Sequence, residues 1–178
     1  MQADLVVAVY ASHADAARAL RTVQGRGFDM RKWSIMGKDV LADERSFGFY
    51  SAGDAMKFWA GRGAIWRDVW GMLVGGGFFF IPPIGPLVVM GPLVSWVVDA
   101  LETAPLGEES AVPAEALKRI GVPLNDLEQR ALDVTRGRFL IVAQCAGSLV
   151  ESARSVLAST GATQLSHVYN PQPTMLDA

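Results

Sequence analysis

Residues 4–20, DLVVAVYASHADAARAL, predict the start of an α/β unit. Apart from Asp4, the first seven are apolar and rich in β-branched side chains, which is typical of a buried strand. Ser12, followed three positions later by Asp15, resembles a capping box, so we expect a helix to begin there. Two glycines would end that helix, and residues 33–36 predict a second strand. The N-terminal part of the chain therefore predicts a strand–helix–strand unit.

The same order of patterns returns near the C-terminus. Residues 138–145, RFLIVAQC, predict a strand, and Ser148 with Glu151 repeats the capping pattern. A helix and a strand at 165–169 complete the second unit. A shift of 136 positions places Ser12 on Ser148, so the two units are in register.

Two such units predict an α+β fold, in which a ferredoxin-like α/β plait is interrupted by an insertion. We expect the plait to comprise residues 1–45 and 136–170. Residues 46–112 are predicted to hold a Gly/aromatic stretch, a hydrophobic helical hairpin and an acidic linker. Residues 113–135 predict a connection of two short helices, and residues 171–178 predict a flexible tail.

The insertion contains thirty residues without a charged side chain, Val69–Val98: VWGMLVGGGFFFIPPIGPLVVMGPLVSWVV. This exceeds the roughly 20 residues of a membrane-spanning helix, but the central prolines should break a continuous helix. We therefore predict two helical arms, at about 66–80 and 87–101. The predicted turn residues are Pro82, Pro83, Gly85 and Pro86. An uncharged arm of about 20 Å is too short to cross a hydrocarbon core of about 30 Å, which favours a re-entrant hairpin or one buried against other copies.

Small and aromatic residues predict how this hairpin packs. Gly71 and Gly75 form a GxxxG pair, a pattern that lets helix backbones approach closely. The residues expected at the packing surface are Gly71, Gly75, Gly76, Gly77 and Gly91. Tryptophans lie at similar distances from the turn on both arms, as at a membrane–water boundary or at the wet rim of a protein interface. The expected interface anchors are Trp66, Trp70 and Trp96.

Composition argues against several classes of function. The formal net charge is -2, so no basic field would attract nucleic acid. A single cysteine excludes an intramolecular disulfide, and only two histidines are present for a metal site. His13, His167 and Cys145 each fit a structural role better than a catalytic one. We therefore expect no catalytic, cofactor-binding or metal-binding residues, and the sequence identifies no small-molecule ligand.

Several short motifs resemble those of an uncharacterised family of small bacterial proteins, known as domains of unknown function or as general-stress-like membrane proteins. The motifs are Gly63-Ala64-x-Trp66, Ile81-Pro82-x-Ile84-Gly85-Pro86, Gly91-Pro92-Leu93 and Ile120-Gly121-Val122-Pro123. The resemblance covers about residues 5–150 and implies a bacterial source with membrane association or oligomerisation, but no catalytic residues. Arg67-Asp68 departs from the small residues expected there, which shortens the apolar arm.

Three functions follow as hypotheses. The first is a non-enzymatic, stress-related protein at the cytoplasmic side of the bacterial inner membrane, whose glycine-rich hairpin inserts among membrane lipids or packs against other copies. The second is a soluble cytoplasmic homo-oligomer, such as a shell, ring or filament, whose hairpins form an apolar core. The third is a sensor that binds a small ligand on the plait face.

Overall fold

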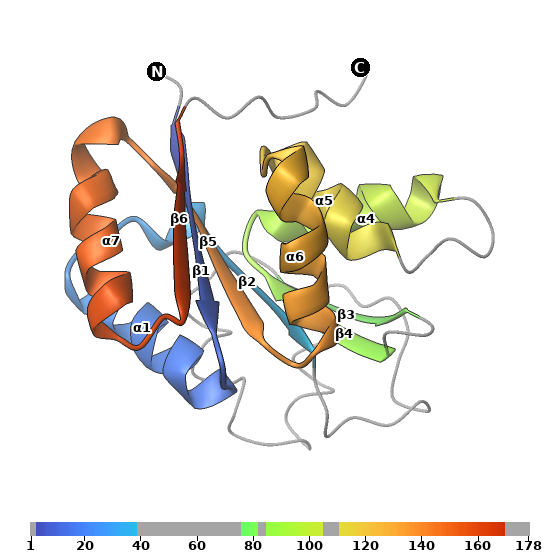
Figure 1. Ribbon diagram of the computed structural model, residues 1–178, viewed down its shortest axis with the longest axis horizontal. Helices are drawn as coiled ribbons and strands as arrows, with labels where there is room; N and C mark the ends of the chain where they lie inside the picture. Colours follow the sequence, from blue (N-terminus) through green and yellow to red (C-terminus); the bar gives the residue numbers. More distant parts are fainter. Residues whose placement is uncertain (1–2, 39–75, 82–84, 105–110, 170–178) are drawn as a thin grey trace.

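The computed structural model describes residues 3–38, 76–81, 85–104 and 111–169 of the chain (Figure 1). The strands are β1 (Asp4–Tyr10), β2 (Trp33–Lys38), β3 (Gly76–Ile81), β4 (Gly85–Met90), β5 (Phe139–Cys145) and β6 (Gln164–Val168). The helices are α1 (His13–Gly25), α4 (Leu93–Thr103), α5 (Val112–Ile120), α6 (Leu124–Thr135) and α7 (Val150–Ser159). The mixed α+β class predicted from the sequence is confirmed.

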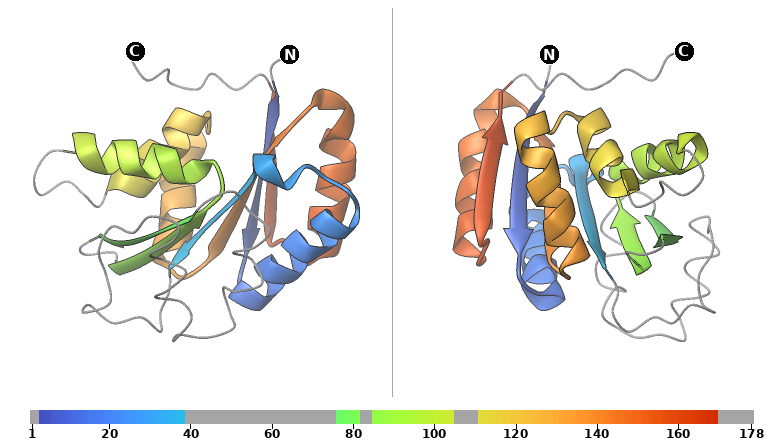
Figure 2. Two further views of the ribbon diagram at one scale, coloured as in Figure 1. Left: turned by 180° about the vertical axis from the view of Figure 1, so that it is seen from behind. Right: turned by 45° about the vertical axis from the view of Figure 1, so that its right-hand side comes forward.

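The strands form one antiparallel sheet of six strands in the order β3-β4-β2-β5-β1-β6. Helices α1 and α7 cover one face of this sheet, and α4, α5 and α6 lie on the other (Figure 2). Side chains of β1 alternate between the two sides, with Val6 and Ala8 toward α1 and α7, and Leu5 and Val7 toward the other three helices. Because both faces are covered, β1 has a continuous apolar sequence instead of an alternating one.

Both predicted strand–helix–strand units are present, but only the first helix is capped as expected. The Ser12 hydroxyl accepts a hydrogen bond from the Asp15 backbone N–H at 3.2 Å. The predicted cap at Ser148 is wrong, because Gly147–Leu149 forms a short 3-10 turn and α7 begins after it without a side-chain cap. The second helix therefore starts later than the sequence pattern indicates.

The predicted first helical arm is wrong over its described residues, and so is the start of the predicted second arm. Gly76–Ile81 and Gly85–Met90 are strands that pair with each other, and β4 also pairs with β2. Short apolar runs bounded by glycine and proline fit a buried strand as well as a helix, and three consecutive glycines disfavour a helix. Helix α4 covers residues 93–101 of the predicted second arm at 87–101, so that arm is helical over most of its length. The N-terminal part of the first arm, residues 66–75, lies outside the described residues.

The chain does reverse direction at the predicted place, because Ile81 pairs with Gly85 across the β3–β4 hairpin. Pro82 and Pro83 lie outside the described residues. Within the parts of the chain that the structure describes, no helix is both long and apolar enough to cross a membrane.

Candidate functional site

The predicted hairpin residues other than Gly91 and Trp96 fall in three groups. Gly76 and Gly77 lie in β3, opposite Met90 and Val89 of β4, so they belong to a strand pair and not to a helix–helix contact. Gly85 and Pro86 begin β4. The following predicted residues lie outside the described part of the chain: Gly71, Gly75, Pro82, Pro83, Trp66 and Trp70.

Gly91 lies at the junction between β4 and α4, where two backbones approach closely. Its φ is +92°, and a Cβ atom there would lie 2.2 Å from the Trp33 carbonyl oxygen. The neighbour that requires a glycine is therefore β2, not the first arm of a helical hairpin. Next to this contact, the buried Ser34 hydroxyl accepts a hydrogen bond from the Leu93 backbone N–H at 3.0 Å. Ser34 thus fixes the start of α4 against the sheet, a role that the sequence did not suggest.

The apolar side chains around this junction lie in the protein interior. Leu87, Val88, Val89 and Met90 are fully buried, with Leu87 and Val89 in the apolar cluster of α4, α5 and α6, and Val88 and Met90 in the cluster on the other side of the sheet. Trp96, on α4, is half-buried and packs against the core beneath α4, α5 and α6. Within the described residues of the apolar stretch, β4 and one face of α4 therefore contact the rest of the chain.

Burial disfavours the thiolate form of Cys145. It is only 4% exposed, and burial raises the pKa of its thiol from the ordinary value of 9.0 to about 11. Because the thiolate is the reactive form, the residue behaves as a small apolar side chain. His13 lies at the start of α1 with its ring edge-on to Phe139, at a centroid distance of 5.7 Å.

His167 joins the two strands at one edge of the sheet. Its Nε2 lies 3.1 Å from Asp4 Oδ2, and both side chains are largely buried. The imidazole also stacks on Tyr169, with ring centroids 3.8 Å apart. Asp4 pairs in register with Cys145, but the buried thiol gives this group no nucleophile. No cluster of three or more His, Cys, Asp or Glu side chains in the described residues could hold a metal ion.

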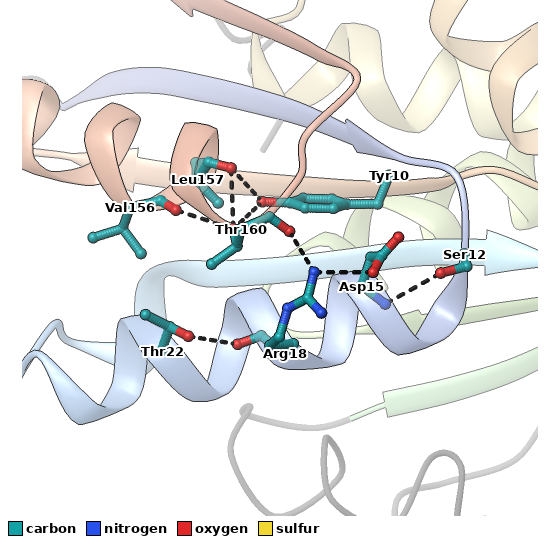
Figure 3. Close-up of polar contacts among 8 residues, drawn as sticks. All are labelled: Tyr10, Ser12, Asp15, Arg18, Thr22, Val156, Leu157 and Thr160. Atoms are coloured by element: carbon teal, nitrogen blue, oxygen red, sulfur yellow. Dashed lines mark hydrogen bonds and ion pairs between the residues drawn. The ribbon is translucent and has the colours of Figure 1, made fainter.

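A buried polar network ties α7 to β1 and α1 (Figure 3). The Tyr10 hydroxyl donates to the Leu157 carbonyl oxygen at 3.0 Å and lies 2.9 Å from Thr160 Oγ1. Arg18 donates to the Thr160 carbonyl oxygen and to Asp15. Burial raises the pKa of Tyr10, so its hydroxyl remains protonated at neutral pH. The network satisfies the last carbonyls of α7 and acts structurally.

A second polar cluster lies where α6 leads into β5. Asp133 is fully buried, and its carboxylate accepts hydrogen bonds from Arg130 at 2.9 Å and from Arg138 at 2.8 Å. Gln129 donates to the same carboxylate at 3.2 Å. A buried carboxylate with this many donors is satisfied, so the cluster ties the end of α6 to the residue that precedes β5.

An open groove of about 640 Å³ lies between the α1–β2 connection and α7. Phe28, Leu149 and Val156 supply its apolar part, and Ser152 and Ser155 are among its polar lining. The two carboxylates of the groove each pair with an arginine, Asp29 with Arg31 and Glu151 with Arg154. A small ligand, as in the third hypothesis, could bind in this groove, but both of its carboxylates already form ion pairs with arginines.

The outer edge of β6 is one of the two sheet edges without a further partner strand among the described residues, the other being that of β3. Among the described residues, β6 pairs only with β1, and it lies at the side of the sheet opposite β3 (Figure 1). Its sequence, QLSHV, contains no lysine, arginine, aspartate, glutamate or proline. Tyr169, immediately after it, is 73% exposed. An edge of this kind has N–H and C=O groups that a further strand can pair with.

Comparison with protein-family models, with curated proteins and with solved structures finds no match.

Proposed function

We propose that the chain is a non-enzymatic protein that assembles with other copies of itself through the edges of its sheet. The observation that carries this proposal is the contrast between the faces and the edge of the sheet. Helices cover both faces, whereas β6 leaves one side of its backbone without a partner among the described residues. Main-chain pairing is therefore the mode of association that this architecture favours.

We also infer that the two strand–helix–strand units form a ferredoxin-like plait. The strand order β2-β5-β1-β6, with antiparallel neighbours and with α1 and α7 on one face, supports this interpretation. On this interpretation, β4 and β3 extend the plait beyond β2, and α4, α5 and α6 cover its second face.

Self-assembly agrees better with the described contacts than insertion of the whole hairpin in lipid. To reach lipid, Leu87 and Val89 would have to leave the interior, and β4 would have to separate from β2. Exposing two such side chains to water would cost about 3–6 kcal/mol, and contact with lipid could offset this cost only after β4 had left the sheet. The open edge of β6 requires no such rearrangement.

Sedimentation velocity of the full chain in detergent-free buffer, over a hundredfold range of concentration, tests the proposal. We expect the weight-average mass to rise above the 19.1 kDa of one chain as concentration increases. A mass that stays at one chain over the whole range would overturn it. Mixing with lipid vesicles before flotation provides the comparison, because a membrane protein would leave the soluble fraction.

A further inference from the structure

Among the described residues, the β6 edge lacks the devices that normally prevent strands from pairing with another chain. Edge strands are usually protected by charged side chains, proline, bulges or a covering segment. Gln164–Val168 has five residues, near the average strand length, and carries no formal charge apart from that of His167 when it is protonated. That imidazole is already held by Asp4. The unpaired N–H and C=O groups of this edge therefore lie among side chains that are nearly all uncharged.

We propose that β6 pairs antiparallel with β6 of a second copy, about a twofold axis that passes beside Ser166. This inference rests on the proposed function and specifies its interface. Alternate residues of an antiparallel strand direct their N–H and C=O groups to opposite sides. Every second residue of β6 thus offers both groups to the second copy. Pairing about this axis joins the two six-stranded sheets into one continuous sheet of twelve strands, and α7 of both copies lies on the same face of it.

Ser166 is the centre because it is the middle residue of the strand, and this choice uses the full length of β6. Ser166 then lies opposite Ser166 of the second copy, and Leu165 lies opposite His167 of that copy. The register with β1 places Ser166 beside Val7 on the α4–α6 face, and Leu165 beside Ala8 on the α1–α7 face. Each pair across the axis therefore shares a face of the sheet.

Charge and side-chain size both permit this pairing. A twofold axis brings identical residues together, so a charged residue at the centre would face its own copy. The central residue is a serine, whose hydroxyl both donates and accepts a hydrogen bond. Beyond the strand, Tyr169 of one copy lies opposite Thr163 of the other, so the exposed ring covers the end of the partner strand. The edge is thus complementary to itself.

A single five-residue strand pair lies at the small end of the interfaces found in stable complexes. We therefore expect a reversible dimer with a dissociation constant of roughly 1–100 μM, and not a permanent assembly. Association at this strength depends steeply on protein concentration.

The test uses two opposite charges at the centre of the interface. In Ser166→Lys, like charges meet across the axis, and the same holds in Ser166→Glu. Each variant alone should bind at least about tenfold more weakly than the unchanged chain. An equimolar mixture of the two should recover association, because lysine then lies opposite glutamate. Ser155→Lys and Ser155→Glu, which place the same charges on the exposed side of α7, serve as controls and should associate normally.

The outcomes separate this inference from the proposed function. If the unchanged chain never associates, both are wrong. If the chain associates but Ser166→Lys does so equally well, self-assembly stands and the β6 interface is wrong. The β6 interface is also wrong if the mixture fails to restore association, or if the Ser155 controls lose it.

A Ser166→Cys variant provides an independent readout should the charged variants fail to fold. Directly opposed residues of an antiparallel pair have Cα atoms about 4.5–5.5 Å apart, which suits a disulfide. Mild oxidation should therefore give a covalent dimer, whereas Ser155→Cys should remain monomeric on a denaturing gel. Failure of Ser166→Cys to cross-link in a chain that self-associates would overturn the interface.

Discussion

The close approach of two backbones at Gly91 gives the sharpest prediction for stability. In Gly91→Ala, the new methyl group would lie 2.2 Å from the Trp33 carbonyl oxygen and 2.8 Å from Ser34 Cα. Both atoms belong to the backbone of β2, so no side-chain rotation relieves the overlap. The alanine would also have to adopt the φ of +92° that glycine adopts freely.

The expected loss of stability combines these two effects. A left-handed conformation costs an alanine about 1–2 kcal/mol, and forcing an extra methyl into a packed site costs about 1–3 kcal/mol. We therefore expect Gly91→Ala to lower the free energy of unfolding by about 2–5 kcal/mol, a large part of the 5–15 kcal/mol typical of a domain. The strand β4 and the start of α4 should be the parts most affected.

Gly27→Ala is the matched control. Gly27 has a φ of +86°, but a Cβ atom there would meet nothing within 4 Å. It should therefore lose only the conformational part, about 1–2 kcal/mol. Urea unfolding followed by far-ultraviolet circular dichroism measures both variants. Equal losses in the two would refute the close approach of β2 and Gly91, and so would a loss in Gly91→Ala below 1 kcal/mol.

Three further predictions concern the polar groups. Asp133→Ala should lower the free energy of unfolding in urea by about 3–5 kcal/mol, because it leaves the buried Arg130 guanidinium without its carboxylate. Glu151→Ala breaks an exposed ion pair and should lower it by less than about 1 kcal/mol. Similar losses in the two variants would contradict this difference. Tyr10→Phe should cost about 0.5–1.5 kcal/mol in the same assay, since it removes the hydroxyl that bonds the end of α7, and an unchanged midpoint would argue against that bond. The rate of alkylation of Cys145 in the folded chain should be low at pH 8 and should increase toward pH 11. Because the thiol ionises at lower pH in the unfolded chain, the free energy of unfolding should fall as the pH rises from about 9 to 11. Cys145→Ala should reduce this pH dependence, and an unchanged pH dependence in that variant would contradict the raised pKa.

The two strand–helix–strand units were predictable because their signals are local. Apolar β-branched runs mark β1 and β5, and the Ser12 cap marks the start of α1 within a few residues of sequence. The cap at Ser148 misled because a 3-10 turn occupies that position, and a pattern of serine and glutamate does not distinguish a turn from a helix start. Local signals thus gave the elements but not every boundary.

That β3 and β4 are strands could not be assigned from sequence, because the information that decides it is not local. Residues 87–90 are apolar at every position, so they show neither a strand period nor a helix period. They become a strand because β2, some fifty residues earlier, supplies an antiparallel partner and because their side chains belong to the apolar clusters on both sides of the sheet. The apolar residues of β4, which suggested membrane association, are instead those of a strand that is buried on both faces.

The polar contacts that stabilise the fold were also beyond sequence reasoning. Tyr10 and Thr160 are 150 positions apart, and Ser34 meets Leu93 across 59 positions. Nothing near these residues in the sequence signals the partner. The β6 edge was similarly hidden, because a strand's place in the sheet order depends on topology and not on its composition.

Hydrogen exchange of residues 85–98 is the most direct test of whether this apolar segment belongs to the protein's own interior. Measured by mass spectrometry in detergent-free buffer, the amides of β4 should be protected as strongly as those of β2 and β5, and adding lipid vesicles should not change their exchange. Fast exchange of β4 in buffer, with protection only after vesicles are added, would contradict the buried sheet and place the segment in lipid.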